Sequence, residues 1–295
     1  EALAKDDCAV TVLTVGLPRE ADARPVGAAW AHVKRWPVLR DASGYVRGYL
    51  PYLSFDVPLL FRLLLAPRPD VVLAEPPPTT GAVVRVATLL RRVPYVWYAA
   101  DVWSDATAIA GAPKPVVAVV RALERFAIRG AAGTIAVSTG VAERVRELGG
   151  RNIKVVPNGI DTSVYSPDVP PLTGPELQDL GIVGTYLVYA GTAWVWQGEQ
   201  IFAHAMERVA EDAPGLQLVF VGQGSQWEEI GSIAAALNGR LGRDAIILHQ
   251  AQNPDWVARL LVGSQGALVS VVPGQGYDFA YPTKVLAGLA AGRPV

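Results

Sequence analysis

The chain has 295 residues, of which 51% are apolar and 18% are charged. This length allows two domains with a core each, and this composition excludes an intrinsically disordered chain. The single cysteine excludes an internal disulfide, and three histidines far apart in sequence form no Cys/His metal cluster. No apolar run approaches the roughly 18 residues that a membrane-spanning helix needs.

The formal net charge of −1 conceals an uneven distribution. Residues 1–160 carry 20 Lys and Arg against 14 Asp and Glu, a net of +6, whereas residues 161–295 carry 6 against 13, a net of −7. The positive charge of the first half has two possible explanations. It is either chance clustering of basic residues on solvated faces, or it forms a surface that faces an anionic membrane or a phosphorylated acceptor. Nucleic acid is not an expected partner, because the arginines are scattered and no reading module is recognisable.

Strand-like apolar runs alternate with helical patterns through the first half of the chain. Strands are expected at 10–15, 70–73, 95–99, 134–137 and 153–156, and helices at 58–66, 80–90, 115–129 and 140–148. Pro115 at the start of one helix and Gly130 after its end are typical helix boundaries. Such a βα series predicts a mostly parallel sheet with helices on both faces.

The second half restarts this alternation. Strands are expected at 186–190, 216–221, 245–248 and 266–272, with a loop at 191–198 and a helix at 199–211. Residues 161–180 are rich in Pro, Asp and Ser and are expected to link an N-terminal domain, 1–160, to a C-terminal domain, 181–295.

The run from Val155 to Pro167 joins the two halves. Pro157 ends a strand, Asn158-Gly159 is a turn pair that tolerates positive φ, and Asp161 can cap the next helical turn. The run resembles the "PNGxDxxxFxP" crossover of the retaining glycosyltransferases of family four. The run from Tyr281 to Val295 resembles that family's donor-site helix, "P-x-K-x-x-E-x-x-A-x-G-x-P-V".

The resemblance implies an α/β protein of the GT-B fold, with two Rossmann-like, doubly wound domains that face a cleft. The N-terminal domain would hold the acceptor and the C-terminal domain a nucleotide-sugar donor. Compared with the family, both ends look incomplete. A first strand with its glycine-rich loop would precede Glu1, and a further strand and closing helices would follow Val295.

Strand ends in the second half are the expected donor site, because open α/β sheets bind ligands beyond the carboxyl ends of their strands. A glycine directly after a strand, here Gly191, allows backbone N–H groups to approach a phosphate closely. The alternative is that the loop is an ordinary βα turn. Lys284 lies in the first turn of the helix that follows Pro282, where a positive charge is unfavourable because of the helix dipole. A bound diphosphate would account for this placement, because both the lysine and the helix N-terminus attract it. The alternative is that Lys284 is simply solvated. The expected diphosphate contacts are Gly191, Thr192, Gln197, Gly198, Thr283 and Lys284.

The resemblance also assigns the rest of the donor. The base is expected at Gln250 and Ala251, and the donor sugar at Gln275, Gly276 and Asp278. The family often has two glutamates in this region, the second of which binds the ribose. Their positions fall here on Phe279 and Ala287, so neither carboxylate is present, and Asp278, one residue away, is the candidate substitute for the first.

In the first half, Asp101 follows the strand at 95–99 and is the candidate catalytic residue. The sequence from Ala100 to Trp103 resembles the "D-L-W" of bacterial exopolysaccharide members of the family. An aspartate at a strand end can orient a sugar hydroxyl or the acceptor. The alternative is that Asp101 is the N-cap of the next helix.

The sequence therefore favours a glycosyltransferase that moves a sugar from a UDP-, GDP- or related nucleotide-sugar to a lipid-linked, saccharide or small-molecule acceptor. Retention of configuration is implied by the resemblance. No Asp-x-Asp occurs, so neither a metal nor a cofactor is expected. The alternatives are a GT-B-type UDP-sugar epimerase and a non-catalytic nucleotide-sugar-binding relative. We expect a cytoplasmic protein at the membrane's cytoplasmic face.

Overall fold

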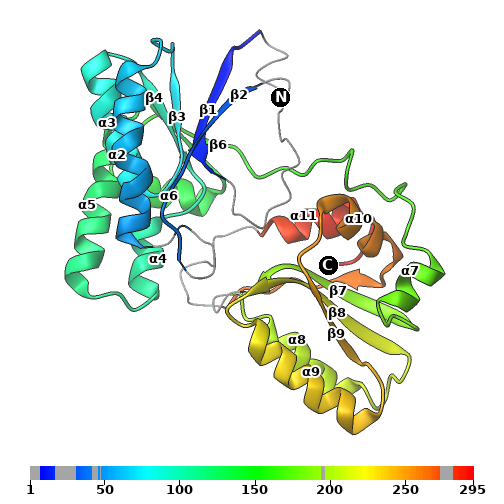
Figure 1. Cartoon of the computed structure of the whole chain (residues 1–295). Helices are drawn as coiled ribbons and strands as arrows, with labels where there is room; N and C mark the ends of the chain where they lie inside the picture. Colours follow the sequence, from blue (N-terminus) through cyan, green and yellow to red (C-terminus); the bar gives the residue numbers. More distant parts are fainter. Residues whose placement is uncertain (1–6, 17–30, 42–45, 47, 194–196, 273–281) are drawn as a thin grey trace. The chain divides into compact units, whose positions relative to one another are not determined.

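The computed structural model describes residues 7–16, 31–41, 46, 48–193, 197–272 and 282–295. The chain divides into two compact units between Val156 and Pro157, inside the run that joins the two halves (Figure 1). We call residues 1–156 unit 1 and residues 157–295 unit 2.

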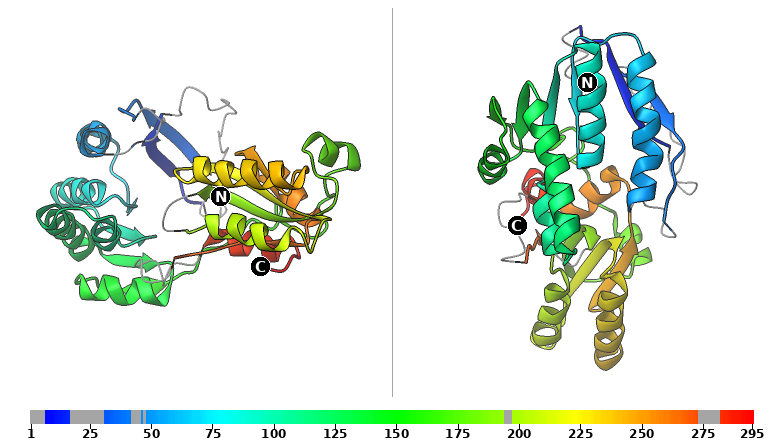
Figure 2. Two further views of the ribbon diagram at one scale, coloured as in Figure 1. Left: turned by 90° about the horizontal axis from the view of Figure 1, so that it is seen from below. Right: turned by 90° about the vertical axis from the view of Figure 1, so that its left-hand side faces the viewer.

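Unit 1 contains a four-stranded and a two-stranded sheet, both parallel. The larger sheet has the order β3-β4-β5-β6, formed by Val72–Ala74, Tyr95–Ala99, Gly133–Ala136 and Ile153–Val155. The smaller sheet pairs β1 (Val10–Val15) with β2 (Ala31–Trp36). The helices described in this unit are α2 (Tyr49–Leu65), α3 (Pro78–Arg91), α4 (Trp103–Ile109), α5 (Lys114–Gly130) and α6 (Thr139–Glu147). Helices α2, α3 and α5 lie side by side (Figure 2).

A close approach of α3 to β4 fixes the core of unit 1. The side chain of Trp97 on β4 is 1% exposed. A Cβ atom on Gly81 of α3 would lie 2.4 Å from the Trp97 ring. Any side chain at position 81 would therefore push the helix off the sheet.

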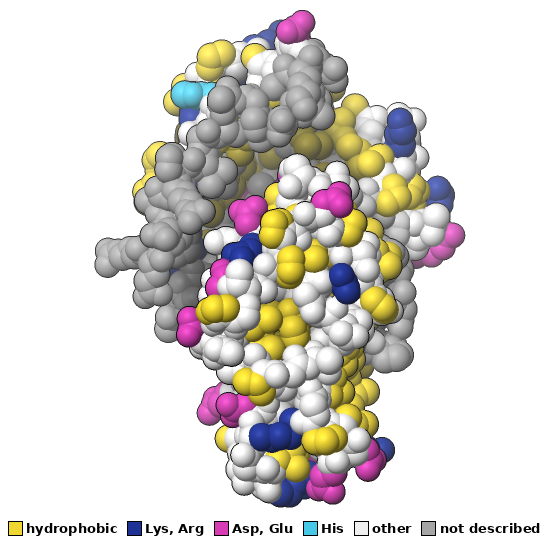
Figure 3. All heavy atoms as spheres, turned by 90° about the vertical axis from the view of Figure 1, so that its right-hand side faces the viewer, with side chains coloured by type: hydrophobic (Ala, Val, Ile, Leu, Met, Phe, Trp, Pro, Cys, Tyr) yellow, Lys and Arg dark blue, Asp and Glu magenta, His cyan; other side chains and the backbone are white. Residues whose placement is uncertain are grey.

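Unit 2 contains one parallel sheet with the order β10-β7-β8-β9. Its strands are Gly266–Ala267 (β10), Thr185–Ala193 (β7), Leu216–Gly224 (β8) and Ile246–Gln250 (β9), and its described helices are α7 (Gly174–Asp179), α8 (Gln200–Val209), α9 (Trp227–Leu241), α10 (Pro254–Gly263) and α11 (Thr283–Ala290). Both charge signs are visible on the face of this unit in Figure 3, interspersed with apolar and uncharged surface.

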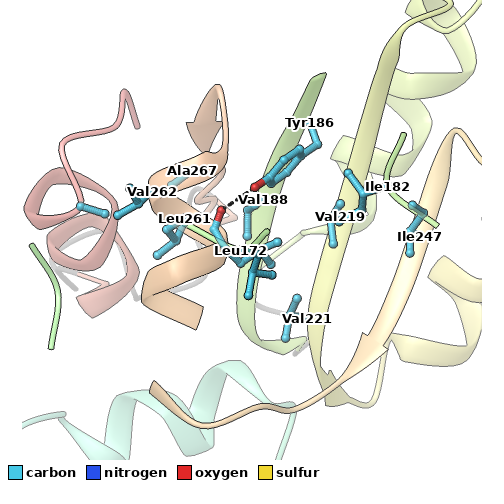
Figure 4. Close-up of a cluster of buried hydrophobic side chains, with 12 residues drawn as sticks. Leu172, Ile182, Tyr186, Val188, Val219, Val221, Ile247, Leu261, Val262 and Ala267 are labelled. Atoms are coloured by element: carbon cyan, nitrogen blue, oxygen red, sulfur yellow. Dashed lines mark hydrogen bonds between the residues drawn. The ribbon is translucent and has the colours of Figure 1, made fainter. Parts of the chain in front are cut away.

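The sheet of unit 2 is buried on both faces, because successive residues of a strand point to opposite sides. Val188 and Val219 contribute to one cluster, which also includes residues of α10 and β10. Tyr189 and Phe220 contribute to the other, with residues of α8 and α9. In the first cluster the hydroxyl of Tyr186 donates a 3.0 Å hydrogen bond to the carbonyl of Leu260, which ties β7 to α10 (Figure 4).

Residues 161–180, expected as the linker, are part of unit 2. Leu172 is buried in its core, and Thr173 and Glu176 form a capping box at the start of α7. The Glu176 carboxylate accepts two hydrogen bonds from the Arg259 guanidinium, at 2.7 and 2.8 Å. This pair joins α7 to α10.

The predicted α/β class with parallel sheets is confirmed, and strands 10–15 and 95–99 are as predicted. The helix expected at 58–66 instead spans Tyr49–Leu65, with Pro58 inside it. Two other segments differ in kind. The predicted loop 191–198 is strand as far as Ala193, which pairs with Gly224 of β8. The predicted strand 266–272 ends at Ala267, and further on the Ser270 hydroxyl donates a 2.6 Å hydrogen bond to the carbonyl of Gln197 instead of extending a strand.

Candidate functional site

The carboxyl ends of β7 and β8 leave no room for a side chain at two glycines of β8. A Cβ atom on Gly222 would lie 1.8 Å from the carbonyl oxygen of Gly191, and one on Gly224 would lie 2.0 Å from that of Ala193. Both glycines also have positive φ, 155° and 154°. Glycine at these positions lets the strand pair continue to its end, so the sequence Gly222-Gln223-Gly224 has a structural role.

Gly191 makes room for the side chain of Lys284. Its φ is 143°, and a Cβ atom there would lie 2.2 Å from Cε of Lys284. The lysine comes from the first turn of α11, whose N-cap is Pro282. Its side chain runs from that helix to the end of β7.

Three oxygen atoms surround the Lys284 ammonium. Nζ lies 2.5 Å from the hydroxyl of Tyr189, 2.8 Å from Oε1 of Gln197 and 3.1 Å from the carbonyl of Thr192. We call Lys284, Tyr189, Thr192 and Gln197 the Lys284 cluster. An ammonium has three protons to donate, so all of them have an acceptor within the protein.

Burial sets the electrostatics of this cluster. Withdrawal from water lowers the pKa of Lys284 to about 8, and the negative charge of Glu199 acts in the opposite direction. Burial also raises the pKa of the Tyr189 phenol, which is therefore neutral at physiological pH. Burial likewise raises the pKa of the Glu199 carboxyl, a residue with 0% exposure.

The other described donor residues named from sequence lie at or next to the ends of helices and strands of unit 2. Gly198 has positive φ, 67°, and forms the turn between Gln197 and α8, and Thr283 is exposed at the start of α11. Gln250 is the last residue of β9, opposite Gly222, and is exposed like Ala251. Gln275, Gly276, Asp278 and Phe279 lie outside the described residues. Ala287 packs against the apolar core of unit 2.

Tyr189 and Glu199 are absent from the sequence-based site. Tyr189 stands inside an apolar strand, where an aromatic residue is typical of a core. Glu199 opens a helix, where an acidic residue is typical of a favourable interaction with the dipole. The signal available in the sequence is that Glu199 follows Gln197-Gly198 directly.

In unit 1, Asp101 follows the end of β4 and does not cap α4. That helix begins at Trp103, and its first amides, Trp103 N and Ser104 N, donate to the Glu124 carboxylate at 2.7 and 3.1 Å. The N-cap alternative for Asp101 is therefore wrong, because a buried glutamate of α5 already occupies that position. The Asp101 side chain reaches the surface, yet partial loss of hydration raises its pKa.

Asp101 shares this edge of the sheet with another acidic residue. The negative charges of Glu75, after β3, and Asp101 add to the effect of burial in raising the pKa of Tyr98. Within the described ranges, no group of three His, Cys, Asp or Glu side chains is placed to hold a metal ion.

Two units with parallel α/β sheets, and a cationic side chain at the strand ends of the second, are features of the GT-B fold class. The chain belongs to Glycosyltransferase Family 4, whose sequence model matches residues 1–164. The family predicted from the two motifs is thus confirmed. No curated protein matches the chain.

Solved structures resemble the chain over nearly its whole length. Sucrose-phosphate synthase from Thermosynechococcus elongatus has a TM-score of 0.72 at 16% identity, over 100% of this chain and 72% of that one. HepE from Anabaena, solved with UDP-glucose, has a TM-score of 0.65 at 15% identity, over 97% and 79%. WaaG, a glycosyltransferase involved in lipopolysaccharide biosynthesis, has a TM-score of 0.66 at 16% identity, over 100% and 74%. At these identities the likeness establishes the fold.

Proposed function

We propose that this protein transfers a sugar from a nucleoside-diphosphate-sugar to an acceptor, and that unit 2 binds the donor. The observation that carries the proposal is the Lys284 cluster, in which a cation stands beside glycine backbone at the carboxyl ends of parallel strands. Membership of the glycosyltransferase family supports the reaction class. The structure of HepE with UDP-glucose supports the donor class.

In this proposal the diphosphate binds between the Lys284 ammonium and the N-terminal amides of α11. Both groups attract an anion, and a charge-assisted contact to phosphate is stronger than the contacts Lys284 makes with neutral oxygens. The diphosphate gains negative charge as the bond to the sugar breaks. Lys284 and these amides stabilise that charge and so favour departure of the leaving group.

The remaining residues recognise the rest of the substrates. Gly191, Thr192, Gln197, Gly198 and Thr283 complete the diphosphate site, Gln250 and Ala251 contact the base, and Gln275, Gly276 and Asp278 contact the donor sugar. Asp101 orients the acceptor hydroxyl, and the configuration at the sugar is retained.

We propose that the donor binds without a divalent metal, because the sequence contains no Asp-x-Asp to bridge a metal to the diphosphate. A nucleotide-sugar should then raise the unfolding temperature of the protein equally with and without a chelator. Loss of both stabilisation and turnover on chelation would contradict this.

A panel of UDP-, GDP- and related nucleotide-sugars tests the function itself. We expect one donor to stabilise the protein and to be consumed in transfer to an acceptor or, slowly, to water. Epimerisation of the donor would instead establish the epimerase alternative. Stabilisation without turnover would establish a binding protein, an outcome to which the replacement of the family's second glutamate by Ala287 points.

We further propose a lipid-linked acceptor at an anionic membrane face, which unit 1 contacts through α2. One stripe of this helix is apolar and exposed, at the helical spacing of three and four residues: Leu50, Leu53, Val57, Phe61 and Leu65. The opposite side is buried, with Asp56 at 1% and Leu59 at 4% exposure. No helix in the part of the chain that the structure describes could span a bilayer.

Basic side chains surround the C-terminal end of this stripe. Arg62 donates to the carbonyl of Lys34, Arg91 to that of Leu63, and Arg68 to that of Arg92. Apolar side chains that insert between lipids and cations that meet anionic headgroups are the two components of reversible surface binding.

A further inference from the structure

Tyr189 connects the apolar core of unit 2 to the Lys284 cluster. The residue is 1% exposed. The centre of its ring lies 5.5 Å from that of Phe220 on β8 and 6.2 Å from that of Phe202 on α8. Because a close-packed core leaves an aromatic side chain little room to move, these contacts hold the ring in one position.

The hydroxyl of Tyr189 contacts every other member of the Lys284 cluster. Its oxygen lies 2.5 Å from Nζ of Lys284, 2.8 Å from the carbonyl oxygen of Thr192 and 2.9 Å from Oε1 of Gln197. Nζ also lies 4.3 Å from the centre of the Tyr189 ring, within the range of a cation–π contact. Two contacts of different kinds therefore join the lysine to one residue of the core.

Lys284 and Tyr189 share two hydrogen-bond acceptors. The Thr192 carbonyl and Oε1 of Gln197 each lie within hydrogen-bond distance of both the ammonium and the phenol. The phenol accepts a hydrogen bond from the ammonium and has one proton of its own to donate. If the ammonium turns one proton away from the Thr192 carbonyl, the phenol can donate to that carbonyl instead, so no acceptor loses its partner.

We propose that Tyr189 is a positioning residue for glycosyl transfer. It keeps its contact with the Lys284 ammonium when a donor binds, and its phenol replaces the ammonium as the donor to the Thr192 carbonyl. The inference rests on the proposed role of Lys284 in the donor site. The Thr192 contact is the one exchanged, because at 3.1 Å it is the longest of the three that Lys284 makes with oxygen. The ammonium then keeps Tyr189 and Gln197 as acceptors and turns its third proton to the diphosphate.

Tyr186 provides a matched control on the same strand. It is 3% exposed and belongs to the apolar cluster on the other face of the sheet. Its hydroxyl donates a 3.0 Å hydrogen bond to the carbonyl of Leu260. Replacement of either tyrosine by phenylalanine thus removes one buried hydroxyl from β7, and only at Tyr189 does that hydroxyl contact Lys284.

Tyr189→Phe, compared with Tyr186→Phe, tests the proposal in the full chain. Both variants should unfold at a somewhat lower temperature than the wild type, because each loses a buried hydrogen bond. Only Tyr189→Phe should weaken binding of a nucleotide-sugar in calorimetry, by roughly 3- to 10-fold, the range for one hydrogen bond. Equal affinities in the two variants would overturn the proposal. Tighter binding by Tyr189→Phe would also overturn it, since the phenol would then compete with the donor for Lys284.

A double-mutant cycle separates positioning of Lys284 from general support of the fold. In a Lys284→Met background there is no ammonium to hold, so Tyr189→Phe should cause no further loss of donor affinity. A structural role would instead reduce the affinity by the same factor in both backgrounds. Additive losses would therefore contradict the proposal.

The contact with Lys284 can also be measured without a donor, by NMR relaxation of lysine labelled with ¹³C at the ε-carbon. Lys284→Arg identifies the Lys284 signal, and the exposed Lys154 serves as the mobile reference. The Lys284 methylene should be restricted in the wild type and in Tyr186→Phe, and distinctly more mobile in Tyr189→Phe. A wild-type Lys284 as mobile as Lys154 would overturn the proposal without any variant. If no nucleotide-sugar binds the wild type, the proposed function fails, whereas relaxation still decides whether Tyr189 holds the lysine.

Discussion

At the scale of single residues, the charge of Lys284 should decide donor affinity. A Lys284→Met variant keeps the length of the side chain and removes its charge. We expect the affinity for a nucleotide-sugar to fall roughly 10- to 150-fold, which corresponds to about 1.5–3 kcal/mol for a hydrogen bond to a charged group. Isothermal titration calorimetry measures this, with Lys154→Met, at an exposed lysine of unit 1, as the control. Equal affinity in the two variants would remove Lys284 from the donor site.

The lowered pKa of Lys284 also predicts a pH dependence. Since that pKa is about 8, the ammonium is charged below this pH and loses its proton above it. The diphosphate of a nucleotide-sugar keeps its charge throughout this range. Donor affinity should therefore be constant between about pH 6.5 and 7.5 and decline above about pH 8, by at most tenfold per unit. Lys284→Arg should abolish the decline, because guanidinium stays protonated; a decline that persists would have another origin.

Much of this cluster could be predicted from the sequence. Gly191, Thr192, Gln197 and Lys284 were all expected from the two strand-end motifs, and the structure brings them together. The participation of Tyr189 could not be predicted, because it depends on a hydrogen bond with a lysine 95 positions away in the chain.

At the scale of elements, the close contact between β7 and α11 depends on Gly191. In a Gly191→Ala variant, the new Cβ would overlap Cε of Lys284. The positive φ of 143° would add about 1–3 kcal/mol of strain for a residue other than glycine. We expect a lower unfolding temperature and a loss of donor affinity.

Gly239→Ala is the matched control for Gly191→Ala. Gly239 lies inside α9, and a Cβ atom there meets no atom within 4 Å. It should raise stability by up to about 1 kcal/mol through helix propensity and leave donor affinity unchanged. Unchanged donor affinity in Gly191→Ala would show that Lys284 can contact the donor without the space that Gly191 leaves for its side chain.

The elements themselves were largely predictable, because apolar runs and Pro or Gly boundaries are local features. The errors occurred in segments whose conformation depends on contacts with residues far away in the sequence. Residues 191–193 read as loop because of Gly191, whereas glycines of β8 allow them to pair as strand. Residues 268–272 read as strand because they are apolar, whereas Ser270 bonds to Gln197 instead.

At the scale of the whole molecule, the exposed stripe of α2 predicts reversible binding to anionic membranes. The protein should co-sediment with anionic vesicles at low salt, bind neutral vesicles weakly, and dissociate as salt screens charges over a Debye length of about 8–10 Å. Comparison of the two vesicle types across a salt series measures this. Equal or absent binding to both at low salt would exclude a membrane site.

Variants locate the contact. Phe61→Glu and Leu65→Glu place charges on the exposed side of α2, so they should reduce binding without altering the unfolding temperature. Val183→Glu, at an apolar residue of unit 2 that is 84% exposed, is the control. If all three variants bind alike, another surface makes the contact.

The three oxygen atoms around Lys284 have a thermodynamic consequence. A lysine side chain loses about 1.5–2 kcal/mol of rotamer entropy when it is fixed in one conformation. Here Tyr189, Gln197 and Thr192 fix it when unit 2 folds. The ordering of this long chain is thus complete before a donor arrives, and association sacrifices correspondingly less conformational freedom. Preorganisation of this kind lets a single flexible cation act as a rigid one.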